Sequence, residues 1–153
     1  MAVLIFTVLL IAMDQISKFY VVKFLKDQGP LVIKEDFLNL FYLENRGAAF
    51  GILQGRRLIF TIITIVVVFI LLKILFKNYK ESSIFLKICI SLILGGTIGN
   101  FIDRIRLHYV VDFISMRIFG YDFAVFNLAD VFIVLGTIIL IIYILKNDTP
   151  DFQ

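Results

Sequence analysis

Cysteine and histidine are almost absent from this chain, which carries one of each in 153 residues. A single cysteine, Cys89, cannot form a disulfide within the chain, and it argues against a cysteine-based metal site. Because Cys89 lies within an apolar run, we interpret it as a buried apolar side chain. His108 has no serine or cysteine nucleophile beside it, so we interpret it as an ordinary surface residue.

Charge is also sparse, since charged residues make up 18% of the chain and the net charge is +3. The lysines and arginines are scattered singly and form no stripe with interleaved aromatic residues, which excludes a nucleic-acid partner. We interpret most of them as anchors that flank membrane helices. The chain has no dense acidic loop, so we expect neither a metal ion nor another cofactor.

Apolar residues, in contrast, make up 61% of the chain, and the mean hydropathy is +1.00. Since a helical span needs about twenty residues, four segments are long enough to cross a bilayer: residues 2–24, 58–76, 84–102 and 126–145. We predict an all-α membrane protein, one domain over residues 1–153, with four transmembrane helices and both termini on one side. The first segment has no preceding Lys or Arg and no cleavage site after it, so we expect it to be retained.

Two longer connections follow the first and third spans. Residues 25–57 alternate partly between apolar and polar residues, and residues 104–125 contain the strand-like HYVVDFI and a turn at Gly120. They predict a small β platform at the membrane surface. Apart from Lys18, nine lysines and arginines fall on the side of these two connections and five on the other side. The short KNYKESS connection (77–83) on that other side is nevertheless denser in positive charge than the long connections. Charge alone therefore leaves the orientation open.

Five acidic residues lie inside or at the edges of the apolar segments: Asp14, Glu44, Asp103, Asp112 and Asp130. A carboxylate at membrane depth is costly and marks a function in catalysis, ion movement or packing. Asp14 and Lys18 are four residues apart on one helix face, so they either pair or act directly, and we expect them to support a neighbouring site.

Small residues accompany polar ones in two segments. In GGTIGNFIDR (95–104), Gly95 and Gly99 form a face for close helix packing. Asn100, Asp103 and Arg104 follow on one helix face; we predict an Asp103–Arg104 ion pair, although Arg104 could equally bind a carbonyl or a phosphate. In ENRGAAFG (44–51), Gly47 lets a ligand approach the backbone, and the Asn45 amide can both donate and accept.

Asp112 and Asp130 have no cationic neighbour in the sequence. Asp112 is wedged between Val111 and Phe113, and Asp130 follows Asn127 by about one helical turn. Two such carboxyl groups brought together would repel each other, raise one pKa and share a proton. One could then act as a base on water while the other, protonated, polarises a carbonyl group.

Five blocks occur in a characteristic order and spacing: DQISK (14–18), ENRGAAFG (44–51), GGTIGNFIDR (95–104), VVDFI (110–114) and FNLAD (126–130). Together they resemble the lipoprotein signal peptidase family, also called signal peptidase II. The resemblance implies an aspartic protease of the bacterial inner membrane that removes the signal peptide from prolipoproteins, cleaving before a diacylglyceryl-modified cysteine, without a cofactor. It also implies cytoplasmic termini, periplasm-facing loops and an active site facing outward.

By the same resemblance, Asp112 and Asp130 are the catalytic pair, with Asp103 as the rival for the first role. Asp103 is otherwise placed in a supporting network with Arg104, and Asp14 and Lys18 buttress the site. The resemblance places four residues in the substrate or inhibitor pocket: Asn45, Asn100, Arg104 and Asn127. The turn that begins at Gly47 is expected to admit only small side chains, and an apolar groove to accept the diacylglyceryl chains. We expect a monomer that contacts prolipoproteins, membrane lipids and globomycin-type inhibitors.

Two other functions remain open at this point. A proton-coupled carrier or channel would also use intramembrane acids and Lys18, but the two halves of the chain show no internal similarity of the kind that carriers have. A helix-packing scaffold explains Gly95 and Gly99, yet it gives no reason for Asp112 and Asp130 to be acidic.

Overall fold

The computed structural model describes residues 2–47, 57–77, 79 and 81–146. Within these ranges the chain forms four long helices: α1 (Ala2–Leu25), α2 (Arg57–Lys77), α3 (Ile84–Arg106) and α4 (Leu128–Lys146). Each is long and apolar enough to cross a bilayer, so the prediction of four transmembrane helices is confirmed. α3 continues past its predicted end at residue 102, because its last polar side chains find partners inside the protein.

Helix α3 is the centre of the bundle. It packs against α1, α2 and α4, and 56% of its span is buried, against 28%, 11% and 17% for the spans of α1, α2 and α4. The outer helices carry large exposed apolar side chains such as Leu58 and Phe69 in α2. A hydrocarbon environment accounts for such a surface, since a protein surrounded by water rarely exposes so large an apolar face.

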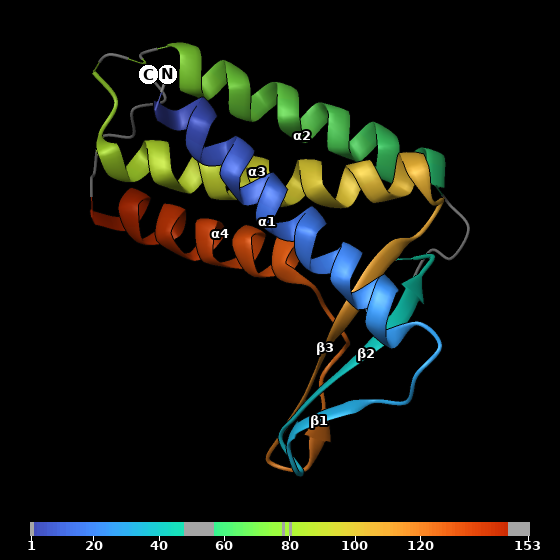
Figure 1. Cartoon of the computed structure of the whole chain (residues 1–153). Helices are drawn as coiled ribbons and strands as arrows, with labels where there is room; N and C mark the ends of the chain where they lie inside the picture. The colour runs from blue at the N-terminus through green and yellow to red at the C-terminus, as the bar shows by residue number, and fades with distance from the viewer. Residues whose placement is uncertain (1, 48–56, 78, 80, 147–153) are drawn as a thin grey trace.

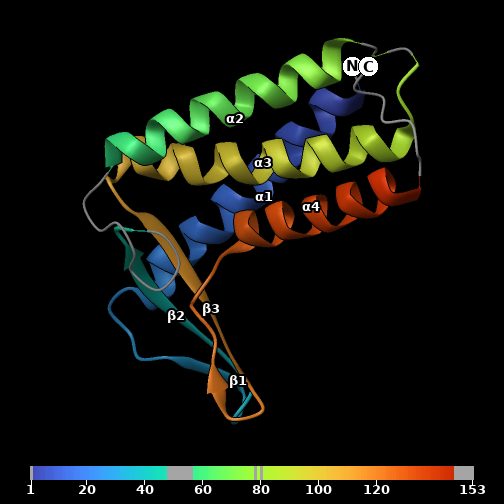
Figure 2. The same cartoon turned by 180° about the vertical axis from the view of Figure 1, so that it is seen from behind.

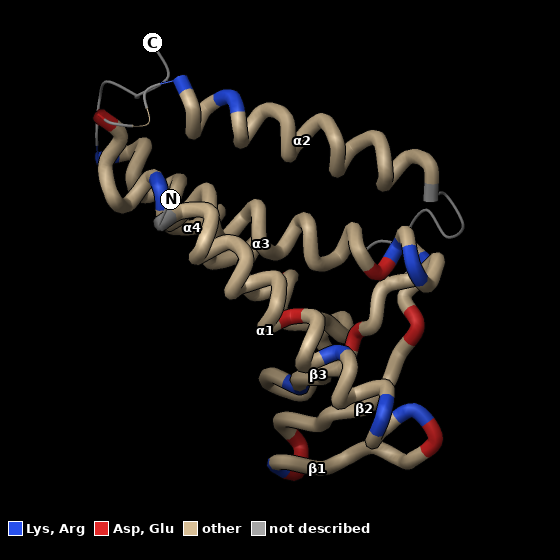
Figure 3. The backbone as a smooth tube through the Cα atoms, turned by 45° about the horizontal axis from the view of Figure 1, so that its top comes forward, with Lys and Arg blue, Asp and Glu red and all other residues tan. Residues whose placement is uncertain are grey.

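The two ends of the bundle differ. The start of α1, the end of α4, the end of α2 and the start of α3 lie at one end, and the strands lie at the other (Figure 1, Figure 2). Charged residues lie mainly near these ends and where the bundle meets the sheet (Figure 3). The middle turns of α2, α3 and α4 carry none, whereas α1 carries the buried pair Asp14 and Lys18. This arrangement fits a bundle whose middle lies in hydrocarbon.

Glycines allow α3 to approach its neighbours closely. A Cβ atom added at Gly95 would lie 2.8 Å from Leu10 Cβ, and one added at Gly99 would lie 2.6 Å from Asp14 Oδ2. The predicted packing role of both glycines is confirmed, with α1 as the partner helix. Gly96 has the same role toward α4, where an added Cβ would collide with the carbonyl oxygen of Ala129.

The strands form a small antiparallel sheet in the order β1-β2-β3-β4. Their bounds are β1 (Leu31–Lys34), β2 (Leu38–Asn45), β3 (Val110–Ile118) and β4 (Tyr121–Asp122). The predicted β platform is confirmed, as is the turn at Gly120: Phe119 and Gly120 have φ angles of 51° and 81°, the left-handed pair that a two-residue hairpin turn requires.

The start of β3 fixes the junction between sheet and bundle. Its first four residues are buried, and Val111 and Phe113 pack in a cluster with Val21 of α1. Asp112 lies between them in the sequence, so its side chain points to the opposite face of the strand.

Candidate active site

The start of α4 is built around a reciprocal cap. The backbone N–H of Asp130 donates to Asn127 Oδ1, and the backbone N–H of Asn127 donates to Asp130 Oδ2, both at 3.1 Å. This is the pattern of a capping box, in which two side chains each satisfy a backbone donor of the first turn. The cap therefore fixes the Asp130 carboxyl at the head of the helix.

Asp112 is held by two amides and not by a cation. Its side chain is buried, with 2% exposed; Asn45 Nδ2 donates to Oδ2 at 2.8 Å and Asn127 Nδ2 donates to Oδ1 at 2.6 Å. Burial raises the pKa of Asp112 to about 6; the charge of Asp130 adds to this rise, while the two asparagine hydrogen bonds oppose it. The carboxyl group is thus poised to exchange a proton near neutral pH.

Asn100 and Asn127 connect the two acids. Asn100 Nδ2 donates to Asp130 Oδ1 at 2.8 Å, and Asn127 Nδ2 donates to Asn100 Oδ1 at 3.1 Å as well as to Asp112. Both asparagines are buried. The network orients both carboxyl groups without neutralising either of them.

Both carboxyl groups line one pocket of about 270 Å³ at the junction of bundle and sheet. The structure brings four further predicted residues to its wall: Asn45, Gly47, Asn100 and Arg104. Asn127 was expected to line the pocket as well, but it is fully buried behind it and acts through its hydrogen bonds. Residues 48–51 of the predicted small-residue turn lie outside the described residues.

Arg104 reaches the pocket without an ion pair to any residue that the structure describes. Its guanidinium carbon lies 4.9 Å from the ring centroid of Phe60 in α2, a contact between a cation and an aromatic face. Nη1 is 3.5 Å from the carbonyl oxygen of Asn100, at the limit of hydrogen-bond distance. The guanidinium therefore keeps donors available for a bound molecule.

The predicted Asp103–Arg104 ion pair is wrong. Asp103 Oδ2 lies 2.9 Å from Lys18 Nζ of α1 instead. Consecutive residues of a helix point in directions roughly 100° apart, so Asp103 faces α1 while Arg104 faces the pocket. Asp103 does not line that pocket.

Lys18 is the centre of a buried cluster behind the pocket. Its Nζ lies 2.9 Å from Asp14 Oδ2, 2.9 Å from Asp103 Oδ2 and 3.0 Å from Asn100 Oδ1. The three acceptors match the three donors of an ammonium group. The predicted pairing of Asp14 with Lys18 is confirmed.

The two acids of this cluster also hold backbone groups of other elements. Asp14 Oδ1 accepts from the N–H of Ala129 in the first turn of α4 at 3.0 Å, and Asp103 Oδ2 accepts from the N–H of Val111 in β3 at 3.2 Å. Ala129 precedes Asp130, and Val111 precedes Asp112. The cluster therefore fixes the backbone beside each acid of the pocket.

Gln15 belongs to this cluster, although its sequence position did not single it out. Its Nε2 is 3.0 Å from Asp103 Oδ1, 3.1 Å from Asp14 Oδ2 and 3.2 Å from the carbonyl oxygen of Gly99. Two of these partners lie on α3, and neither hydropathy nor helical spacing reports contacts between helices. Its position beside Asp14 in the DQISK block was the one available signal.

The remaining polar residues of interest lie outside the pocket. Glu44 pairs with Arg46 at 2.9 Å and accepts from Tyr42 at 3.0 Å; it precedes Asn45 on β2 and so points to the opposite face of the sheet. His108 is exposed and Cys89 is fully buried, as the sequence predicted.

Comparison with known proteins identifies relatives along almost the whole chain. A family model described as "Signal peptidase (SPase) II" matches residues 6–146. A lipoprotein signal peptidase of Clostridium tetani is 46% identical over 146 residues, covering 95% of this chain and 93% of that protein. One of Staphylococcus aureus is 41% identical over 140 residues, covering 92% and 85%.

The fold has solved counterparts as well. A structure described as a bacterial membrane enzyme superposes with a TM-score of 0.88 at 37% sequence identity, covering 97% of this chain and 90% of that one. A second superposes with a TM-score of 0.84 at 38% identity, covering 95% and 94%. With the family model matching from the first span to the last residue of α4, this chain belongs to the signal peptidase II family.

Proposed function

We propose that this protein is a membrane aspartic endopeptidase that removes signal peptides from prolipoproteins, cleaving before the diacylglyceryl-modified cysteine. Family membership supports the removal of signal peptides. The aspartic mechanism rests on one observation: Asp112 and Asp130 line the same pocket, and each is held by neutral amide donors. Acids that served only for packing would be expected to pair with cations, as Asp14 and Asp103 do.

The chemistry uses a water molecule and one proton shared by the two carboxyl groups. The ionised carboxylate takes a proton from water, and the water oxygen attacks the scissile carbonyl carbon. The protonated carboxyl gives its proton to the carbonyl oxygen. When the tetrahedral intermediate collapses, the C–N bond breaks and the newly protonated carboxyl group gives its proton to the leaving nitrogen. One hydroxyl group of the intermediate returns its proton to the other, ionised carboxylate as the new carbonyl group forms, which restores the starting state of one shared proton.

Neighbouring donors would position the peptide. Arg104 lines the same pocket with free donors, so we assign it to the peptide carbonyl groups, where positive charge also stabilises a developing oxyanion. The Asn45 amide borders the pocket between Gly47 and Asp112, in a place to contact the peptide backbone.

A neighbouring apolar pocket suits the lipid part of the substrate. It has a volume of about 470 Å³ and lies between the β3–β4 hairpin and α4, and it shares Phe126 and Asp130 with the polar pocket. Val134 and Leu135 line it and are about half exposed, so it opens toward the hydrocarbon. We assign a diacylglyceryl chain to this groove.

The same proposal gives the orientation of the protein in the membrane and the molecules that it contacts. Prolipoproteins are cleaved after export, so the sheet and the pocket face outward near the outer leaflet of the bacterial inner membrane, and both termini are cytoplasmic. The protein acts as a monomer in contact with membrane lipids. Globomycin-type inhibitors bind where the peptide binds.

Purified protein with a diacylglyceryl-modified prolipoprotein peptide tests this function. We expect Asp112→Asn and Asp130→Asn each to reduce turnover by at least about 10³-fold, because each removes a proton-transfer group. Asp122→Asn is the matched control, since Asp122 is exposed on β4 and pairs with Arg117. Near-normal turnover in either pocket variant would refute the assigned pair. If Asp103→Asn, correctly folded, were inactive while Asp112→Asn was active, Asp103 would take the catalytic role.

A further inference from the structure

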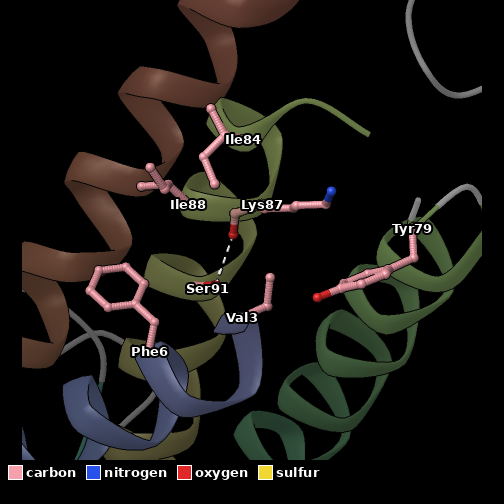
Figure 4. A pocket seen from close by; sticks show the side chains of 7 residues that line it. All are labelled: Val3, Phe6, Tyr79, Ile84, Lys87, Ile88 and Ser91. Carbon is pink, nitrogen blue, oxygen red and sulfur yellow. Dashed lines mark hydrogen bonds between the residues drawn. The ribbon is translucent and has the colours of Figure 1, made fainter. Parts of the chain in front are cut away.

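A second pocket lies at the opposite end of the bundle from the sheet. This crevice, of about 310 Å³, is bordered by the first turns of α1 and α3 and by Tyr79 (Figure 4). It shares no residue with the pocket of Asp112 and Asp130. Its volume is at the lower end of the roughly 300–1,000 Å³ typical of small-molecule sites.

The walls of the crevice are mainly apolar. Val3 and Phe6 come from α1, and Ile84 and Ile88 come from α3 (Figure 4). Val3 is buried, whereas Phe6 and Ile84 are 37% and 63% exposed. The crevice therefore opens sideways from the helix bundle, in the direction from which a lipid chain of the bilayer would enter.

A lysine stands beside these apolar walls. Lys87 lies in the first turn of α3, within roughly 6 Å of the helix start along its axis. Its Nζ lies 4.9 Å from the ring centroid of Tyr79, and it forms no ion pair with any described residue. Long lysine side chains near the end of a span place their ammonium group at the headgroup level.

The base of the crevice has no comparable charge. Ser91 is buried, and its hydroxyl donates to the carbonyl oxygen of Lys87 at 2.8 Å (Figure 4). The hydroxyl hydrogen of Ser91 is thus already engaged in a hydrogen bond within α3. The site consequently combines an apolar interior with a cation near one edge, which is the chemistry of a chain that carries an anionic head.

Charge at this end of the bundle favours an anion as well. Among described residues, four lysines stand here against one acid. Lys73, Lys77 and Lys146 lie near the ends of α2 and α4, Lys87 lies in the first turn of α3, and Glu81 lies between α2 and α3. Each lysine near an anionic membrane surface strengthens association with that surface.

We propose that this crevice binds one anionic phospholipid of the surrounding bilayer. An acyl chain lies against Val3, Phe6 and Ile88, and the phosphate pairs with Lys87. The bound lipid joins α1, α3 and the segment at Tyr79 at the end of the molecule away from the candidate active site.

Native mass spectrometry of the full chain, titrated with phosphatidylglycerol or phosphatidylcholine, tests the proposal. We expect one phosphatidylglycerol to bind more tightly than phosphatidylcholine. Lys87→Gln should weaken phosphatidylglycerol binding roughly fivefold or more, as expected for the loss of one lysine at a charged surface, and Lys87→Arg should restore it. The matched control is Lys73→Gln, which also removes one charge at this end but from an exposed position outside the crevice.

Four results would overturn the proposal. Equal binding of the two lipids would remove the role of the phosphate, and equal losses in Lys87→Gln and Lys73→Gln would show diffuse attraction to the surface and no defined site. A dimer that Lys87→Gln dissociates would show that a second copy of the chain occupies the crevice. Glycerol 3-phosphate, which lacks acyl chains, should compete at least tenfold more weakly than the lipid; equal competition would reduce the site to a phosphate site.

Discussion

Asp112 is a carboxyl group whose surroundings disfavour its ionised form. Its pKa is about 6 in the folded protein, against an ordinary value of 3.8, chiefly because of burial. This shift makes the free energy of unfolding depend on pH, because Asp112 ionises less readily in the folded state than in the unfolded state. The resulting loss of folding stability is absent below about pH 4 and fully present above about pH 6. Asparagine at this position cannot ionise and serves as the reference.

We expect wild type to lose stability relative to Asp112→Asn as the pH rises from about 4 to about 6. The shift corresponds to on the order of 2–3 kcal/mol, or roughly 2–4 °C in Tm for each kcal/mol. Circular dichroism melts of both proteins in detergent at several pH values measure the difference. A difference that stayed constant or grew in favour of wild type across this window would contradict the stated cause of the shift.

Asn127 serves the helix and the pocket at once. Asn127→Ala removes the cap of α4 and withdraws donors from Asp112 and Asn100. We expect a loss of about 2–3 kcal/mol in the free energy of unfolding, larger than a cap alone provides. Since the Asn127 hydrogen bond lowers the pKa of Asp112, the acid limb of the cleavage pH profile should also move to higher pH.

The matched control for this variant is Ser83→Ala. Ser83 caps α3 by accepting from the N–H of Leu86 at 3.1 Å, far from the pocket. It should cost about 1 kcal/mol and leave the pH profile unchanged. A pH profile unchanged in Asn127→Ala as well would mean that the residue acts on α4 alone.

At the level of elements, the contact of α3 with α4 sets the position of Asp130. A Cβ atom at Gly96 would collide with the backbone oxygen of Ala129 and come within 2.8 Å of Ile133 Cγ1. A backbone atom at a helix start cannot move aside as a side-chain end can. We expect Gly96→Ala to destabilise the protein by about 1–3 kcal/mol and to lower kcat by displacing the head of α4.

Gly29→Ala is the control for that substitution, because a Cβ atom there meets nothing within 4 Å. Unfolding can be followed with a thiol-reactive dye, since the one cysteine, Cys89, is fully buried. Equal Tm values for Gly96→Ala and Gly29→Ala would show that α3 and α4 can separate without cost.

The elements of this fold could be predicted because hydropathy reports them directly. Long apolar runs gave the four spans, and the turn at Gly120 gave the β3–β4 hairpin. The end of α3 could not be predicted, because Asp103, Arg104 and Arg106 break the apolar run, and only partners on other elements allow the helix to continue through them.

The residues of the polar site could be predicted from the sequence, but the contacts between their side chains could not. Sequence blocks named six residues that the structure places on one pocket. The partner of Asp103 was misassigned, because closeness in sequence favoured Arg104, whereas Lys18 lies 85 positions away and reaches Asp103 only through the packing of α1 on α3. Gln15 was not predicted for the same reason, because its contacts with Gly99 and Asp103 also depend on the packing of α1 on α3.

For the whole molecule, the Lys18 cluster is the point where bundle and sheet are joined. Through Asp14 and Asp103 it holds α1, α3, the start of α4 and the start of β3. Removing one member of a buried ion cluster destabilises a protein more than replacing the whole cluster with apolar residues, because the remaining charges stay buried without a partner.

Lys18→Met should therefore destabilise the protein by about 3–5 kcal/mol, because the buried carboxyl groups of Asp14 and Asp103 would lose their cation. Lys146→Met, at an exposed position in the last turn of α4, should leave Tm unchanged. If charge compensation is the cause, adding Asp14→Asn and Asp103→Asn to Lys18→Met should recover part of the lost Tm. A triple variant less stable than Lys18→Met would show instead that the carboxylates, through their bonds to Ala129 and Val111, hold the junction even without the lysine.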